Sequence, residues 1–166
     1  MRLSIKPMKR ADLDDVMGIE EGAFTSPWNR AMYLHELERL DACYLAARSG
    51  RLLIGYGGVL VILDEAHIMT LAVRDDYRRQ GIAMRILLGL IDRAEEMGAR
   101  FLTLEVRKSN HAAISLYEKL GFQIMGERKH YYIDNLENAL IMWTDRITLP
   151  ENIKLLRNLR KKYSDE

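Results

Sequence analysis

The sequence predicts an α/β (α+β) fold: a mixed, mostly antiparallel sheet of seven strands with helices on both faces. Its 166 residues suit a single domain. Apolar patterns of strand and helix type follow one another in the order β-α-α-β-β-β-α-β-α-β-β. This order combines local antiparallel pairs with one β-α-β crossover, so a doubly wound Rossmann arrangement is excluded. No internal repeat or linker precedes Pro150.

The first third of the chain is predicted to contain one strand and two helices. Arg2–Pro7 alternates as a strand does, and Pro7 ends it. Asp12 is placed to cap a helix that runs to about Glu21, and Gly22–Trp28 breaks the helical pattern as a loop. The second helix carries its apolar stripe at Met32, Leu34, Leu37 and Leu40.

Three strands are expected next. Ala42–Arg48 and Leu52–Leu63 are joined by a turn at Ser49–Gly50, and His67–Val73 follows. Glycines weaken the middle strand and indicate a bulge or a close approach by another element. They are Gly55, Gly57 and Gly58.

The second half is predicted to contain two helices, each ended by a glycine, and three strands. The helices are Met84–Met97, closed by Gly98, and one that runs from a cap at Ser109 or Asn110 through Leu120, closed by Gly121. The strands are Phe101–Val106, Gln123–Tyr132 and Ala139–Asp145.

Composition narrows the class of protein. The formal net charge is only +1, which gives no support to a non-specific nucleic-acid binder. Cys43 is the only cysteine, so no intrachain disulfide can form, and we expect a buried structural thiol in a cytoplasmic protein. We see no signal peptide, and the longest apolar run, around Tyr56–Leu63, is too short to span a bilayer. We therefore expect a soluble protein without a membrane partner.

The most informative stretch is Val73–Ala83, VRDDYRRQGIA, in which a strand ends and a long helix begins. Backbone N–H groups at such a turn converge on an anion, and the helix dipole favours negative charge there. Gly81 allows a conformation without Cβ interference, and Arg78 and Arg79 supply charge for phosphate oxygens. The alternative to an anion-binding turn is an ordinary solvent-exposed turn. Neither a Walker loop nor a GxGxxG dinucleotide fingerprint is present.

Several motifs together resemble the GNAT superfamily of N-acetyltransferases. RRQGIA matches the pyrophosphate-binding pattern R/Q-x-x-G-x-G/A of that family. LAVRDDYRRQGIA, LTLEVRKSNHAAISLYEKLGF and KHYYIDNLENALIM look like its N-terminal protein acetyltransferases, a group with bacterial ribosomal-protein alanine acetyltransferases and archaeal counterparts. The similarity covers approximately residues 1–146.

The resemblance implies acetyl-coenzyme A as cosubstrate and no metal. Two central strands would splay apart, and acetyl-coenzyme A would lie in the gap. Asn110 would bond the cofactor arm. Backbone groups of Leu71, Ala72 and Val73 would pair with the pantetheine arm and supply the oxyanion donor. The pyrophosphate would be held by Arg78, Arg79, Gln80, Gly81, Ile82 and Ala83.

Glu105 is the predicted general base. A free α-amino group has a pKa of about 8, so a base that accepts its proton is useful at neutral pH. Glu105 lies in the otherwise apolar strand FLTLEVR, where an unpaired carboxylate is costly. The alternative is a structural ion pair with Arg107 or another basic residue. The resemblance favours catalysis.

The resemblance implies that Tyr117 is the general acid. Tyr117 shares a helix face with Asn110, and a phenol can protonate a departing thiolate. From its position alone it would be a core tyrosine. His67 is a secondary candidate, in a water relay with Glu105. A lone strand histidine is more often a satisfied structural group.

The resemblance assigns peptide recognition to two loops, although these residues could instead cap the core. The archaeal enzymes carry a glutamate near Trp28 and this chain does not, so their two-carboxylate mechanism is not expected here. The residues are Phe24, Pro27 and Trp28 in the first loop and Tyr131 and Tyr132 in the second.

Residues 149–166 are predicted to form a basic amphipathic helix that follows an acetyltransferase domain over residues 1–148. This helix could contact a ribosome or an auxiliary subunit, but packing on its own domain is the plainer expectation. The chain would be a monomer or a homodimer. The expected substrate is a protein N-terminus. A small-molecule amine and a non-catalytic acyl-coenzyme A-binding subunit are the alternatives.

Overall fold

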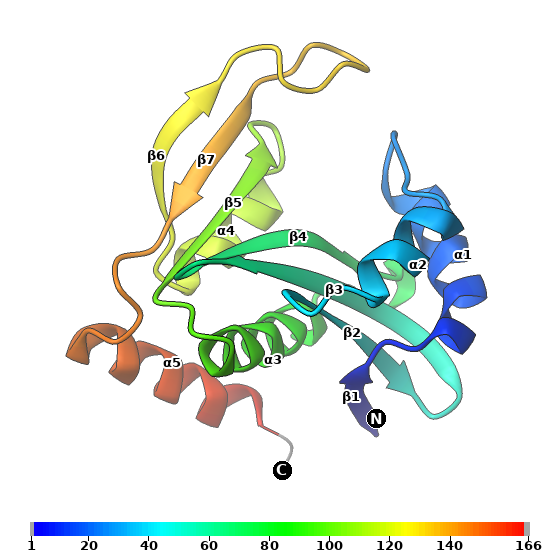
Figure 1. Ribbon diagram of the computed structural model, residues 1–166, viewed down its shortest axis with the longest axis horizontal. Helices are drawn as coiled ribbons and strands as arrows, with labels where there is room; N and C mark the ends of the chain where they lie inside the picture. The colour runs from blue at the N-terminus through cyan, green and yellow to red at the C-terminus, as the bar shows by residue number, and fades with distance from the viewer. Residues whose placement is uncertain (1, 165–166) are drawn as a thin grey trace.

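The computed structural model describes residues 2–164. The strands are β1 (Leu3–Pro7), β2 (Ala42–Ser49), β3 (Leu52–Ile62), β4 (Glu65–Val73), β5 (Phe101–Arg107), β6 (Gln123–Arg128) and β7 (Ala139–Trp143). The helices are α1 (Leu13–Ala23), α2 (Arg30–Leu37), α3 (Ile82–Glu96), α4 (His111–Lys119) and α5 (Pro150–Tyr163), with 3-10 turns at Arg10–Asp12 and Asp75–Tyr77. One seven-stranded sheet has the order β1-β2-β3-β4-β5-β7-β6 (Figure 1). The predicted fold class and element order are confirmed.

The single parallel pair of the sheet, β4 with β5, is also where the sheet opens. These strands pair only over Glu65–His67 and Phe101–Thr103, whereas the other neighbouring strands pair antiparallel. Beyond these positions β4 and β5 diverge, and β5 continues with β7 and β6 as a separate arm (Figure 1). Among residues 2–164, the edge of β4 that faces β5 therefore has no strand partner from Ile68 to Val73. This is the splayed pair that the family resemblance implied.

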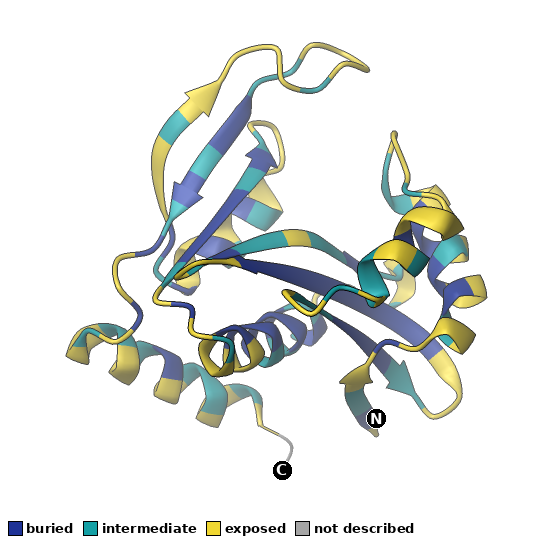
Figure 2. Cartoon of the chain, viewed as in Figure 1, coloured by how far each residue is buried: buried dark blue, intermediate teal, exposed yellow. Residues whose placement is uncertain are grey.

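Two apolar cores lie on opposite faces of the sheet, and their burial is visible in Figure 2. One core packs α1 and α2 against the sheet, with Leu13, Tyr33 and Tyr56 fully buried. The other packs α3 and α4 against the opposite face, where Ile86 and Leu90 of α3 are fully buried. Each such side chain contributes about 1.5–3 kcal/mol when it is removed from water. Helices therefore flank the open region from both sides.

The glycines of β3 serve both of the purposes expected of them. A Cβ on Gly57 would lie 2.8 Å from Ile86 Cγ2, so the glycine lets α3 approach the sheet closely. Gly58 pairs with Thr70 and Val59 with Ile68, which leaves Met69 of β4 as an extra residue. This bulge comes directly after the last positions at which β4 pairs with β5. It therefore bends β4 at the mouth of the opening.

The predictions for the first two helices were only partly right. Leu40 is 99% exposed because α2 ends at Leu37, and the buried residue of this helix is Tyr33 rather than one of the expected stripe. Met32 of that stripe is also exposed. Asp12 stands at the N-cap position of α1, as predicted, but its side chain makes no cap bond, because its carboxylate accepts the Lys9 N–H at 2.7 Å instead.

The last helix packs on the domain. Leu156 of α5 is buried, and Arg160 lies 2.7 Å from Asp92 and 3.5 Å from Glu95 of α3. Two basic side chains of its last turn, Lys161 and Lys162, remain exposed. Residues 165 and 166 of the expected extension lie outside the described residues. None of the helices within 2–164 is long and apolar enough to cross a membrane.

Candidate functional site

The turn between β4 and α3 has the backbone shape of an anion-binding loop. Arg79 and Gly81 both adopt left-handed conformations, with φ of 59° and 77°. Asn29 and Asn110 cap α2 and α4, but no side chain within residues 2–164 caps α3 at Gly81. The first N–H groups of α3 therefore remain available to a negatively charged ligand, where the helix dipole also favours it.

Side chains surround this turn without filling it. Arg78 is 59% exposed, and its Nη2 lies 2.9 Å from Asp75 Oδ1. A pocket of about 300 Å³ separates the turn from α1 and is lined by Gly18, Gly22, Val73 and Arg78, among others. One end of the unpaired edge of β4 therefore has an exposed arginine and an open pocket beside it.

The C-terminal helix reaches the same turn. A Cβ on Gly81 would lie 2.9 Å from Cε1 of Tyr163, so the tyrosine ring packs against the glycine. Gly81 is therefore required twice, by its positive φ and by this close contact.

Asn110 stands at the start of α4, as expected. Its Oδ1 accepts the N–H of Ala113 at 3.2 Å, which makes it the N-cap of the helix. Its amide oxygen is thus engaged in capping.

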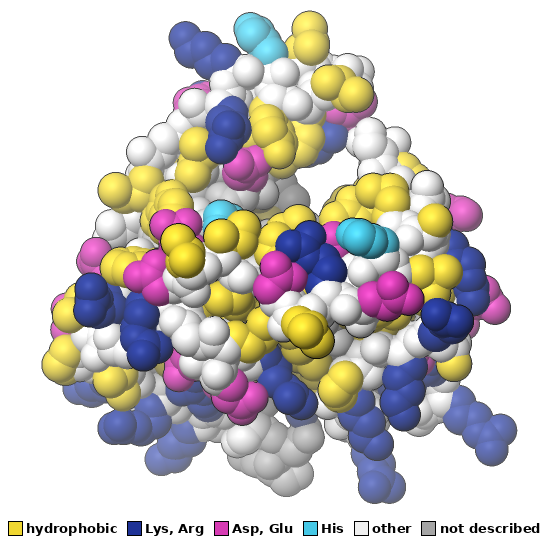
Figure 3. Space-filling view, viewed as in Figure 1, with side chains coloured by type: hydrophobic (Ala, Val, Ile, Leu, Met, Phe, Trp, Pro, Cys, Tyr) yellow, Lys and Arg dark blue, Asp and Glu magenta, His cyan; other side chains and the backbone are white. Residues whose placement is uncertain are grey.

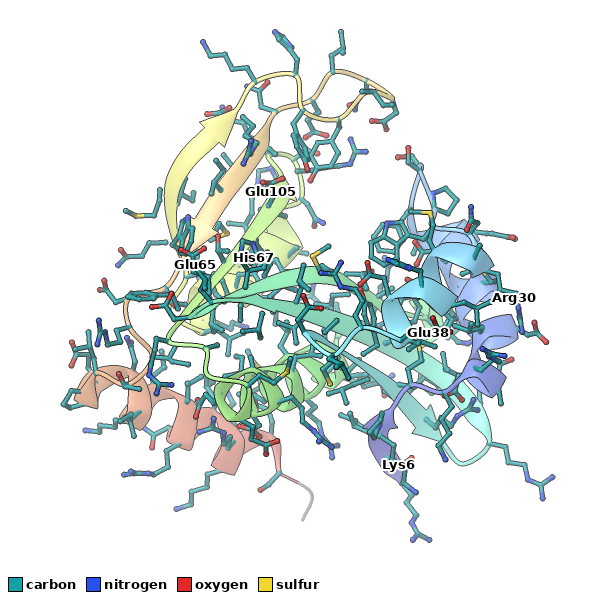
Figure 4. All side chains as sticks on the ribbon, in the orientation of Figure 1. Lys6, Arg30, Glu38, Glu65, His67 and Glu105 are labelled. Atoms are coloured by element: carbon teal, nitrogen blue, oxygen red, sulfur yellow. The ribbon has the colours of Figure 1, made fainter. Side chains whose placement is uncertain are left out.

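Glu105 lies on β5 beyond the segment paired with β4, beside the opening of the sheet (Figure 4). Its carboxylate is 2.9 Å from Nε of Arg128. The interaction of Tyr131 with Glu105, together with burial, raises the pKa of Tyr131 to about 12. The expected ion-pair alternative is present in the structure, with Arg128 as the partner rather than Arg107. The carboxylate is 29% exposed and so remains accessible.

Tyr117 lies on α4, on the other side of the opening. It is buried, with its ring centroid 5.7 Å from that of Phe122. Burial, helped by the proximity of Tyr132, raises the pKa of Tyr117 to about 12. Tyr132 in turn lies near Glu105, whose charge contributes to raising the pKa of Tyr132 after the larger effect of burial. The structure therefore gathers Glu105, Tyr117, Tyr131 and Tyr132 around the gap.

His67 occupies the last position of β4 that pairs with β5, opposite Thr103. Because strand residues alternate, His67 and Glu105 face the same side of the sheet (Figure 4). The Nε2 of His67 lies 3.6 Å from Glu65. Within residues 2–164, no direct hydrogen bond joins His67 to Glu105.

The loop between α1 and α2 is held by a buried carboxylate. Glu20 is 2% exposed and accepts hydrogen bonds from the Tyr33 hydroxyl at 2.5 Å, the Tyr56 hydroxyl at 2.6 Å and the Trp28 N–H at 3.1 Å. Trp28 and Phe24 are only partly buried and pack against the core below them. Pro27 of the same loop is exposed. Two side chains of this loop thus lie on the core while part of each remains at the surface.

The second loop lies between β6 and β7. The rings of Tyr131 and Tyr132 are 5.1 Å apart in an edge-to-face arrangement. The Cζ of Arg107 lies 3.9 Å from the Tyr132 ring centroid, and Arg107 also contacts Asp134. In Figure 3 a hollow separates this arm from the lobe of α1 and α2. The two expected peptide loops therefore stand on opposite sides of one opening.

Cys43 is half-buried rather than fully buried, and it lies away from this opening. It lines a second pocket of about 300 Å³ that contains none of the predicted site residues. Burial raises the pKa of its thiol, which keeps it protonated and unreactive. The structural interpretation of this cysteine is supported.

Three polar residues of the site were not predicted. Glu20 falls at the helical spacing of Leu13, Val16 and Met17, and a carboxylate at such a position was the available signal. Arg128 and Asp134 left no such signal, because their partners are 23 and 27 residues away along the chain and only the folded sheet brings them together.

The chain is similar in sequence to known N-acetyltransferases. The Acetyltransferase (GNAT) family matches over residues 13–122. An Escherichia coli (strain K12) [ribosomal protein bS18]-alanine N-acetyltransferase is 36% identical over 141 residues, covering 84% of this chain and 95% of that protein. A Bacillus subtilis (strain 168) protein provisionally named for the same activity is 41% identical over 143 residues, covering 86% and 95%.

Solved structures share the architecture. The Escherichia coli ribosomal-protein-S18-alanine N-acetyltransferase superposes with a TM-score of 0.80 at 34% identity, covering 91% of this chain and 98% of that one. Arabidopsis thaliana NAA60 in complex with acetyl-CoA shares the fold with a TM-score of 0.78 at 19% identity, covering 87% and 99%. The chain belongs to the GNAT family and is an N-acetyltransferase.

Proposed function

We propose that this enzyme transfers the acetyl group of acetyl-coenzyme A to the N-terminal amine of a protein, either a ribosomal protein or nascent chains. The observation that carries the proposal is the partnerless edge of β4, which leads from the phosphate turn to the cluster around Glu105 and Tyr117. Six residues from Ile68 to Val73 give this edge a length of about 20 Å. The relatives named for alanine N-acetylation of a ribosomal protein support an α-amine as the acceptor.

The residues present fit acetyl-coenzyme A. The uncapped start of α3 and the left-handed Gly81 suit a diphosphate, and Arg78 adds positive charge. The free edge at Leu71–Val73 suits an amide-containing arm that pairs as a strand would. When bound, acetyl-coenzyme A supplies an activated acetyl group at the far end of this track. Backbone N–H groups of β4 would stabilise the oxyanion, an effect typically worth about 3–4 kcal/mol.

Glu105 and Tyr117 then divide the proton transfers. Glu105 accepts a proton from the substrate ammonium, directly or through one water, on the face of the sheet that carries the two peptide loops. Tyr117, on the side of α4, donates a proton to the departing sulfur. Its pKa of about 12 keeps this phenol protonated at neutral pH. His67 is the secondary candidate for a water-mediated relay to Glu105.

The two loops would clasp the first residues of the substrate. Phe24, Pro27 and Trp28 form one wall, and Tyr131 and Tyr132 form the other. A wall on each side favours an extended peptide over a small amine, which would need neither loop.

Residues 1–148 would act as the catalytic domain and residues 149–166 as an extension. The exposed lysines of α5 are available to a ribosome or an auxiliary subunit. The single half-buried cysteine suits a reducing cytoplasm. We propose either a monomer or a homodimer.

A peptide panel tests the proposal. Coenzyme A release is measured with acetyl-coenzyme A and peptides that begin with Ala, Ser or Met, with the same peptides already N-acetylated as matched controls. We expect release with free N-termini, best with Ala, and none with the blocked peptides. Release only with a polyamine or a free amino acid, or binding of the cofactor without any transfer, would contradict it.

A further inference from the structure

Arg107 joins three segments at the mouth of the opening. It is the last residue of β5, two positions after Glu105 and therefore on the same face. Its Nη2 lies 3.1 Å from Oγ1 of Thr25 in the loop between α1 and α2. The same nitrogen lies 3.0 Å from both carboxylate oxygens of Asp134 in the loop between β6 and β7.

Further contacts fix the guanidinium in place. Its Nη1 lies 3.2 Å from Oδ1 of Asn135 and 3.5 Å from Oε1 of Glu137, and its Cζ lies 3.9 Å from the centroid of Tyr132. Glu137 is held in turn by the N–H of Ser109 at 2.7 Å. The Arg107 side chain is 25% exposed, so these bonds are partly shielded from water. A planar fork with several donors and an aromatic neighbour is a role that lysine cannot reproduce.

The contact with Arg107 lowers the pKa of Asp134. The hydrogen bond between these two residues is the largest cause of the lowered pKa. Arg107 at the end of the strand therefore joins Thr25 of one loop to Asp134 of the other. We call these three residues the loop tie.

We propose that Arg107 is a positioning residue that holds the two substrate loops at a fixed separation, so that the enzyme acts on peptides. This inference rests on the proposed function. Arg107 takes no part in proton transfer. Its role is to hold in place the two loops that carry Trp28, Tyr131 and Tyr132. Loops that are already held in their binding arrangement lose less conformational entropy when a peptide binds.

The test compares Arg107→Lys with Arg48→Lys. Arg48 makes a comparable set of bonds, to Asp12, Asp15 and the carbonyl of Arg51, with 27% of its side chain exposed, but it contacts neither substrate loop. We expect Arg107→Lys to raise the KM for an alanine-starting peptide about 10- to 100-fold, the range for loss of hydrogen bonds to charged groups. The KM for acetyl-coenzyme A should stay within about twofold of wild type. The KM for alaninamide, which ends after the first residue and so makes fewer loop contacts than the peptide, should rise clearly less than the KM for the peptide. Arg48→Lys should leave all three values unchanged.

A double-mutant cycle locates the effect. Asp134→Asn should raise the peptide KM by itself, and the double variant with Arg107→Lys should raise it by clearly less than the product of the two. An unchanged peptide KM, or equal shifts in the KM values for peptide, alaninamide and acetyl-coenzyme A, would overturn the inference. If wild-type protein acetylates no peptide, the proposed function fails instead, so the two failures are distinguishable.

Discussion

The two halves of the proposed site are built in different ways. The phosphate turn is made by eleven consecutive residues, Val73–Ala83, and its binding groups are backbone N–H donors. The peptide side is made by side chains that are distant in sequence, as in the bond between Arg107 and Thr25, which spans 82 residues. A local backbone site depends on the few residues that set its conformation. A non-local side-chain site depends on each of its members.

The largest effect is expected at Glu105. Glu105→Gln removes the proton acceptor but keeps the shape and much of the hydrogen bonding to Arg128, so kcat/KM for peptide should fall about 10²- to 10⁴-fold. The dissociation constant for acetyl-coenzyme A should not change, because the phosphate turn is separate. Steady-state kinetics together with calorimetric titration of acetyl-coenzyme A check both statements. Near-normal turnover by this variant would reduce Glu105 to a structural partner of Arg128.

A smaller loss, of about 10²-fold in kcat, is expected for Tyr117→Phe, which removes the proton donor and keeps the ring. The pH profile sharpens this prediction. Because the pKa of Tyr117 is raised to about 12, the phenol stays protonated as the pH rises, and wild-type kcat should show no decline caused by Tyr117 between pH 8 and 10. An alkaline decline in wild type that disappears in Tyr117→Phe would show instead that the phenol ionises in this range.

Gly81→Ala tests the cofactor side with the smallest expected effect. A side chain in the left-handed region costs roughly 1–2 kcal/mol, and the new Cβ would also meet the ring of Tyr163. We expect the KM for acetyl-coenzyme A to rise about tenfold, a free-energy difference of about 1.4 kcal/mol, while the peptide KM changes little.

Gly50→Ala is the matched control for that variant. Gly50 has a similar φ of 60°, no atom within 4 Å of its would-be Cβ, and a position in the remote turn between β2 and β3. The melting temperature of Gly50→Ala should fall less than that of Gly81→Ala, because only the new Cβ at Gly81 meets Tyr163, and both KM values should be unchanged. If both glycine variants raised the KM for acetyl-coenzyme A equally, the effect would come from general backbone strain and not from loss of the phosphate turn.

The sequence predicted the local features and missed those that depend on distant contacts. The order of elements, the turn at Arg78–Ala83 and the caps at Asn110 and Gly121 were predictable because each is encoded by neighbouring residues. The partner of Glu105 was not, because Arg128 reaches it only through the pairing of β5 with β7 and of β7 with β6.

Burial was the other source of error. Of the expected apolar stripe of α2, Leu34 and Leu37 pack partly buried against the core. The fully buried position of this helix is Tyr33, whose hydroxyl donates to Glu20, and a buried phenol–carboxylate pair has no signature in hydrophobic spacing. The loop tie was missed for the same reason that Arg128 was, since Thr25, Arg107 and Asp134 come from three separate segments.

A crystal structure with bound coenzyme A tests the central claim most directly. We expect the diphosphate within hydrogen-bonding distance of the N–H groups of residues 79–83, the arm along Leu71–Val73, and the sulfur beside the hydroxyl of Tyr117 with Glu105 across the gap. Coenzyme A held at another surface, or no binding at millimolar concentration, would contradict it.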